Sequence, residues 1–146
     1  MAILFIKEGV NKPQLKYRVV TKWLKRVISI YGFVNGDLTY IFCDDDFLKI
    51  INSKYLNHDY YTDIVTFDYC NNKIVSGDMF ISVDRVRENS VKFCCDEKEE
   101  FLRVMIHGLL HLFGFNDINK LDRESMRKRE DECLLLFSEV YNENIR

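Results

Sequence analysis

The stretch 101–113 constrains the fold more than any other part of the chain, because almost every position in it is apolar. A surface helix carries one apolar stripe, whereas a helix that is apolar nearly all round has to be buried. Asp96 supplies a side-chain acceptor that can cap the start of such a helix, and Gly114 can end it. The pattern therefore predicts a central helix from about Asp96 to Phe113 that other elements cover.

Shorter apolar runs predict the elements around this helix. Runs rich in β-branched and aromatic residues favour strands over 3–7, 37–43, 64–69 and 75–83, with the last two forming a hairpin. Apolar residues three to four positions apart favour helices over 15–30, 44–55 and 121–141, and Ser82 or Asp84 can cap a short helix that runs to about Val91. Since these strands and helices mix without strict alternation, we expect an α+β fold.

Local turn and cap signals refine these boundaries. Asn35 and Gly36 are expected to form a turn before the second strand, and Pro13 suits the first position of the first helix. Asp44 can cap the second helix, whose inner face is expected to include Ile50 and Tyr55.

Length and composition limit the classes of protein that the chain can represent. Its 146 residues, 47% of them hydrophobic, suit one compact domain spanning 1–146. With 21 basic and 23 acidic residues, no overall positive field indicates a nucleic-acid partner, so RNA binding would need a local patch. Five cysteines without a C-x-x-C pair argue against a disulfide framework and against a cysteine-ligated zinc site. No run has the length of a signal peptide or membrane span, so we expect a soluble, cytoplasmic protein without a membrane partner.

Two histidines on the central helix carry the clearest chemical signal. His107 and His111 are four residues apart, so their rings project from one helix face and can meet at one ion. Asp117 is the first carboxylate after the Gly114 turn and can supply a third ligand, as catalytic zinc sites usually require. Gly108 costs about 1 kcal/mol relative to alanine in a helix interior, which suggests close approach by another backbone. These residues predict a site for one transition-metal ion, most simply zinc, although buried histidines can also be satisfied core residues.

The residues near this pair limit its chemistry. A zinc protease of the H-E-x-x-H type has its glutamate base directly after the first histidine, where this chain has Gly108. Glu130 shares a helix face with apolar residues and therefore points toward the core. One expectation is that Glu130 accepts a hydrogen bond from the ring N–H of a ligand histidine that faces away from the metal, or that it pairs with Arg103 or Arg127. The alternative is that it lies at the rim of the domain in a surface ion pair.

Several stretches, in order along nearly the whole chain, resemble the YbeY-type metal-dependent endoribonucleases that mature ribosomal RNA. They are 56–67, 77–82, 107–117, and Met126 with Glu130. The resemblance implies a single domain with helices around a small mixed four-stranded sheet, and one zinc ion per chain held by three ligands. It implies cleavage of single-stranded RNA in 16S rRNA maturation and ribosome quality control, with His107 and His111 as catalytic residues. The expected partners are rRNA and ribosomal particles or proteins, and no DNA.

The chain departs from the family pattern at three positions. Asp117 stands where the family usually has a third histidine; two histidines and a carboxylate suit zinc and also iron(II). Asn116 stands where the family often has an aspartate, and its amide is a poor zinc ligand. Leu56 stands where the family commonly has an arginine that is thought to face the RNA, and His58 or Lys54 could replace that arginine only in part.

These departures leave two other functions open. Leu56 favours a non-catalytic, zinc-stabilised ribosome-assembly factor, and paired histidines alone do not exclude a metallohydrolase acting on peptides or small esters. Basic residues on the first and last helices could contact phosphates or simply form solvated faces; they are Lys22, Lys25, Arg26, Arg123, Arg127, Lys128 and Arg129. Structural hydrogen bonding is expected for Thr62, Asp63, Asp78 and Ser82.

Overall fold

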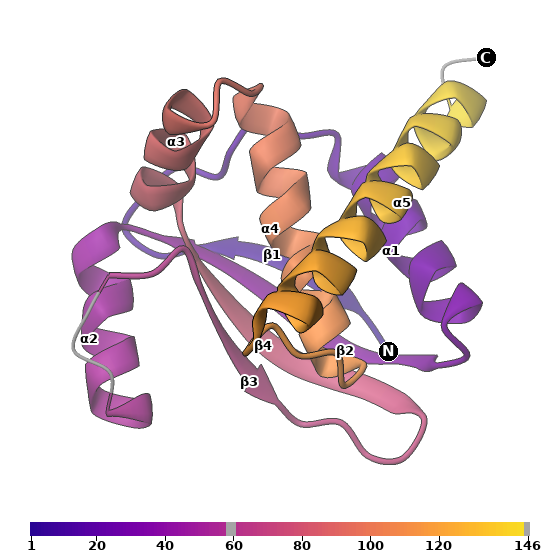
Figure 1. Ribbon diagram of the computed structural model, residues 1–146, viewed down its shortest axis with the longest axis horizontal. Helices are drawn as coiled ribbons and strands as arrows, with labels where there is room; N and C mark the ends of the chain where they lie inside the picture. The colour runs from indigo at the N-terminus through magenta and orange to yellow at the C-terminus, as the bar shows by residue number, and fades with distance from the viewer. Residues whose placement is uncertain (58–60, 145–146) are drawn as a thin grey trace.

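Over residues 1–57 and 61–144, which the computed structural model describes, four strands form one sheet and five helices pack around it (Figure 1). The elements are β1 (Ile3–Lys7), α1 (Tyr17–Ile30), β2 (Val34–Cys43), α2 (Asp45–Leu56), β3 (Ile64–Asp68), β4 (Ile74–Ser82), α3 (Val83–Lys92), α4 (Glu97–Leu112) and α5 (Lys120–Asn144). The strand order is β1-β2-β4-β3, with β1, β2 and β4 parallel and β3 antiparallel to β4. The expected α+β class and the mixed four-stranded sheet are therefore confirmed, while His58 lies outside the described residues.

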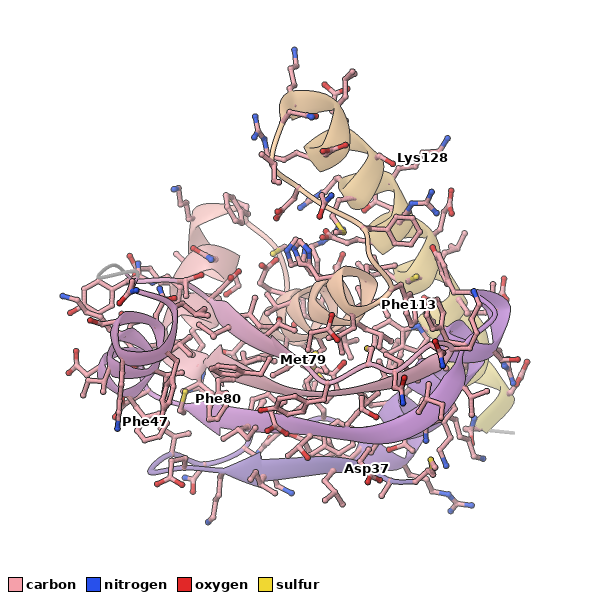
Figure 2. The ribbon with its side chains drawn as sticks, turned by 90° about the horizontal axis from the view of Figure 1, so that it is seen from below. Asp37, Phe47, Met79, Phe80, Phe113 and Lys128 are labelled. Carbon is pink, nitrogen blue, oxygen red and sulfur yellow. The ribbon has the colours of Figure 1, made fainter. Side chains whose placement is uncertain are left out.

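Helix α4 is the predicted buried helix, and it lies against one face of the sheet (Figure 2). Asp96 caps it by accepting a hydrogen bond from the backbone N–H of Lys98 at 2.9 Å. A Cβ atom on Gly108 would lie 2.7 Å from Ile64 Cδ1 and 2.9 Å from Met79 Sδ. The glycine thus permits the close approach that the sequence predicted, but the neighbours are side chains of β3 and β4 rather than backbone.

Helix α2 covers the opposite face of the sheet. Phe47 stacks on Phe80 of β4 with ring centroids 6.4 Å apart (Figure 2), and Asp44 caps the helix as predicted. The predicted inner face is wrong at Ile50, which is 62% exposed, whereas Tyr55 is 56% exposed but packs edge-on against Phe67 of β3 with ring centroids 5.9 Å apart. The fully buried residues of this helix are instead Leu48 and Asn52, one turn apart.

Two predicted boundaries are wrong. Asn35 and Gly36 lie inside β2 and form no turn; a shift of register between Asn35 and Leu38 accommodates one extra residue of β2, as a β-bulge or similar irregularity does. Pro13 precedes α1, which begins at Tyr17. The Tyr17 hydroxyl donates to the Pro13 carbonyl at 2.6 Å, so the proline segment is tied to the helix start without being helical.

Helix α5 crosses over α4 and also packs on α1 (Figure 1). The Trp23 indole N–H of α1 donates to the Cys133 carbonyl of α5 at 2.7 Å, and both residues are buried. As predicted, Met126, Cys133 and Val140 of α5 are also buried. This docking places Glu130 behind the last turns of α4. None of the described helices is both long and apolar enough to cross a membrane.

Candidate metal centre

The C-terminus of α4 is shaped by a Schellman turn at Gly114. Gly114 has a φ of +102°, which side-chain-bearing residues rarely adopt. Its N–H donates to the His111 carbonyl at 2.9 Å, and the Phe115 N–H donates to the Leu110 carbonyl at 3.1 Å. The predicted helix stop is confirmed, and the reversal brings Asp117 back to the last turns of the helix.

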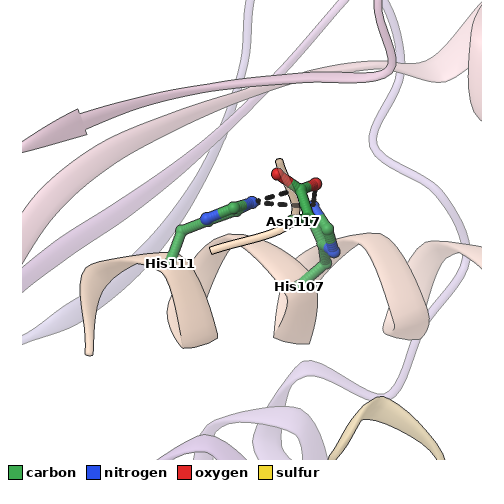
Figure 3. Close-up of side chains that lie close together, drawn as sticks. All are labelled: His107, His111 and Asp117. Atoms are coloured by element: carbon green, nitrogen blue, oxygen red, sulfur yellow. Dashed lines mark hydrogen bonds and ion pairs between the residues drawn. The ribbon is translucent and has the colours of Figure 1, made fainter. Parts of the chain in front are cut away.

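Three side chains meet at this end of α4 (Figure 3). The Nε2 atoms of His107 and His111 lie 3.0 Å apart, and Asp117 Oδ2 lies 3.3 Å from the first and 3.4 Å from the second. A tetrahedral zinc ion with bonds of about 2.0–2.1 Å holds its ligand atoms about 3.3 Å apart. The spacing and the donor atoms fit that geometry, so this group could bind one metal ion.

The same three side chains remain accessible from outside. The side chains of His107, His111 and Asp117 are 23%, 28% and 41% exposed. A structural zinc site is closed by four protein ligands, whereas a catalytic site keeps a position open. A group of three candidate ligands at a partly exposed edge therefore resembles a catalytic site more than a structural one.

Glu130 of α5 lies behind His107. It is 5% exposed; its Oε2 is 2.6 Å from His107 Nδ1, and its Oε1 accepts from Arg103 at 3.0 Å. The surface-rim alternative for Glu130 is thus wrong, and its expected pairing with His107, a candidate ligand, and with Arg103 is confirmed. Sequence reasoning missed Asp131, which accepts from the second Arg103 nitrogen at 2.7 Å. Asp131 is an exposed helix residue, so no pattern in the sequence distinguishes it.

The carboxylates around His107 set its affinity for a proton. Burial alone lowers the pKa of His107, but the hydrogen bond and charge of Glu130, with the charges of Asp117 and Asp63, outweigh burial and raise the pKa above its usual value. Burial raises the pKa of Asp63, and the charge of His107 partly opposes that shift. Because a metal ligand must be deprotonated, protons compete with a metal at this site, and the competition grows as the pH falls.

Polar residues on the neighbouring strands have structural partners. Ser82 is fully buried, caps α3 through the Arg85 N–H at 3.1 Å, and donates to Asp45 Oδ1 at 3.0 Å. The Thr62 hydroxyl donates to the Ile64 carbonyl at 3.4 Å. The side chain of Asp63 accepts from backbone N–H groups at the start of β3. These contacts agree with the structural role expected for these residues.

The basic residues fall into two groups. On α1, Arg26 pairs with Glu143 at 3.0 Å and Lys22 donates to Asn144 at 2.7 Å, so these cations hold α5. At the start of α5, just after Asp117, a shallow hollow of about 410 Å³ is lined by Lys120, Arg123, Glu124, Arg127, Lys128 and Asp131. Leu56, at the end of α2, is 38% exposed and supplies no positive charge to that part of the surface. The second group forms a cationic surface directly after residues 113–119, the loop that carries Asp117 and is called the metal-site loop below.

Known proteins match the chain over most of its length. Residues 6–138 match the model of the family described as Endoribonuclease YbeY. Curated proteins named Endoribonuclease YbeY from Bacteroides thetaiotaomicron and Phocaeicola vulgatus are 46% and 47% identical to it, each over 93% of this chain and 99% of the relative. The solution structure of TM1509 from Thermotoga maritima superposes with a TM-score of 0.67 at 22% identity, covering 98% of this chain and 93% of that one. That structural likeness supports the fold alone.

Proposed function

Because the chain belongs to the YbeY endoribonuclease family, we propose that it is a zinc-dependent endoribonuclease that cleaves single-stranded RNA in 16S rRNA maturation and ribosome quality control. The observation that carries the proposal is the meeting of His107, His111 and Asp117 at an open edge of α4. Residues 1–146 would work as one metal-binding domain. Its partners would be rRNA and ribosomal particles or proteins, in the cytoplasm where ribosomes assemble.

The ligand set suits chemistry on a phosphodiester. When bound, zinc supplies a Lewis acid that polarises a phosphoryl oxygen and acidifies water. Two neutral imidazoles and the Asp117 carboxylate offset only one of its two charges, so the site keeps a net positive charge toward an anionic substrate. Gly108 leaves the position after His107 without a carboxylate, which separates the site from zinc proteases that use a glutamate there.

The start of α5 is the best-placed surface for phosphates flanking the site. Lys120, Arg123 and Arg127 follow Asp117 within about three helical turns and line the same hollow. Arg123 donates to the Ile118 carbonyl at 2.8 Å, which holds this cation beside the metal-site loop. In our proposal these cations bind RNA phosphates and substitute in part for the arginine that Leu56 replaces.

Metal content and RNA cleavage measured on the same variants test the proposal. The wild type is expected to carry about one zinc per chain and to cut single-stranded but not duplex RNA. His107→Ala with His111→Ala should lose both the metal and the cleavage. Asp117→Ala should also weaken metal binding, and Asn116→Ala is its matched control, since Asn116 is exposed on the same loop and is not expected to be a ligand. Full metal retention by the double histidine variant would end the proposal.

Leu56 favours a second candidate, a zinc-stabilised ribosome-assembly factor that does not cut RNA. In that case the folded, zinc-loaded wild type binds RNA without cleaving it. Cleavage by the wild type that is lost in His111→Ala, and that persists in a folded Leu56→Arg variant, counts against this candidate. A parallel peptide digest without metal-dependent cleavage removes the peptidase alternative.

A further inference from the structure

The carboxylate of Glu130 has both of its oxygens engaged inside the protein. One oxygen lies 2.6 Å from His107 Nδ1, and the other accepts a hydrogen bond from Arg103 at 3.0 Å. Glu130 is 5% exposed, and it lies on α5, outside the helix and loop that carry the three candidate ligands. It therefore contacts the metal site only through the back of one imidazole ring.

This contact selects the proton arrangement of His107. A carboxylate ion accepts hydrogen bonds and cannot donate them, so the short contact places the ring proton of neutral His107 on Nδ1. The lone pair is then on Nε2, the atom that lies 3.0 Å from His111 Nε2 and 3.3 Å from Asp117 Oδ2. A histidine with the opposite tautomer would present an N–H to the ion and could not bind it.

Arg103 holds Glu130 in place. Arg103 precedes His107 by one helical turn on α4, so its guanidinium and the imidazole lie on the same helix face. One guanidinium nitrogen donates to Glu130, and another donates to Asp131 Oδ1 at 2.7 Å, so the arginine spans two consecutive residues of α5. The cation also balances the charge of a carboxylate that is shielded from water.

We propose that Glu130, anchored by Arg103, is a positioning residue that fixes the tautomer and the orientation of His107 for metal binding. The proposal rests on the proposed function insofar as His107 is taken as a ligand. Partners of this kind behind a ligand histidine typically change metal affinity by about 10–100-fold. The metal site would then extend to α5, although α5 supplies none of the three candidate ligands.

Glu130→Gln separates positioning from packing, because glutamine has nearly the same size. Arg103 can only donate, so the glutamine oxygen turns toward Arg103 and its NH₂ group turns toward His107 Nδ1. An N–H donor at that place favours the opposite tautomer of His107. Glu130→Asp keeps the negative charge but is one methylene shorter, so it cannot pair with Arg103 and reach the ring at once.

Zinc affinity is measured by competition with a chelator, and the His107 tautomer by ¹⁵N NMR of the ring nitrogens in metal-free protein. We expect both variants to bind zinc about 10–100-fold more weakly with an unchanged far-UV spectrum. We also expect Glu130→Gln to shift His107 away from the Nδ1–H form that we infer for the wild type. Glu132→Gln is the matched control, since Glu132 is an exposed carboxylate two positions further along α5.

The two readouts make failure of the positioning role distinguishable from failure of the proposed function. Wild-type zinc affinity and an unchanged ring spectrum in Glu130→Gln would overturn the positioning role. A wild type that binds no zinc would overturn the proposed function, while the ring spectrum of the metal-free protein would still decide the tautomer. If Glu130→Gln does not fold, the zinc affinity of Glu130→Asp decides the question, and an affinity equal to that of the wild type would overturn the positioning role.

Discussion

The contact between Gly108 and β3 allows a quantitative test of how α4 is seated on the sheet. In Gly108→Ala, the helix gains about 1 kcal/mol of intrinsic propensity. The new Cβ would lie 2.7 Å from Ile64 Cδ1 and 2.9 Å from Met79 Sδ, and both are closer than real Cβ contacts come. Overpacking of a filled core typically costs about 1–3 kcal/mol. The net result is a loss of about 0–2 kcal/mol in the free energy of unfolding.

Ile64→Val removes the nearest of these atoms and makes the origin of the loss measurable. Alone, this truncation should cost about 0.5–1.5 kcal/mol. In the Gly108→Ala background, the same truncation relieves the contact, so the double variant should be more stable than the sum of the single changes predicts. We expect a coupling of at least about 0.5 kcal/mol in that direction, beyond the scatter of independent sites.

Urea unfolding followed by circular dichroism measures the four members of this cycle. The metal is removed with a chelator, because zinc bound only to the folded state would add its own binding energy. Ile28→Val is the control, since Ile28 is a buried residue of α1 that does not contact Gly108, and its effect should add to that of Gly108→Ala. Additive free energies for Gly108→Ala and Ile64→Val would refute the idea that this contact sets the position of α4.

Substitutions at Gly114, Asp117 and Glu100 test the turn, the candidate ligand set and a buried carboxyl group, respectively. Gly114→Ala should lower stability by about 1 kcal/mol or more in urea unfolding, because alanine disfavours a φ of +102°. Gly114→Asn, which tolerates that conformation better, should cost less. Asp117→His should retain about one zinc per chain by elemental analysis, because imidazole is an equally competent ligand; a metal-free product would argue against the loop as a ligand. Burial, and then the charge of Asp63, raises the pKa of Glu100. The contribution of Glu100 to the free energy of unfolding is therefore fully present at low pH and is lost as the pH rises through this raised pKa. Glu100→Gln should therefore raise Tm at pH 7 but not near pH 4. Glu99→Gln, a control at an exposed position, should leave Tm unchanged at both pH values.

Features that depend on neighbouring residues in the chain were predictable from the sequence. The burial of α4, the caps at Asp44 and Asp96 and the Schellman turn at Gly114 each follow from a short pattern whose physics is local. The meeting of His107 and His111 follows from helical periodicity in the same way. Ile50 could not be placed by the same means, because its burial depends on how α2 rolls against the sheet, which sequence periodicity does not determine.

The residues behind the candidate ligands show where local patterns stop being informative. Periodicity along α5 predicted that Glu130 points inward. Its partners Arg103 and His107 lie on α4, so these contacts depend on how the two helices cross. That crossing is held from the other side as well, since the buried indole of Trp23 donates to the carbonyl of Cys133, less than one turn from Glu130. Helix α5 is thus fixed between α1 and α4 at the level of the metal site. The position of His107 therefore depends on a helix that contributes no candidate ligand, and under our proposal the metal affinity of this chain depends on the packing of three helices as well as on the spacing of two histidines.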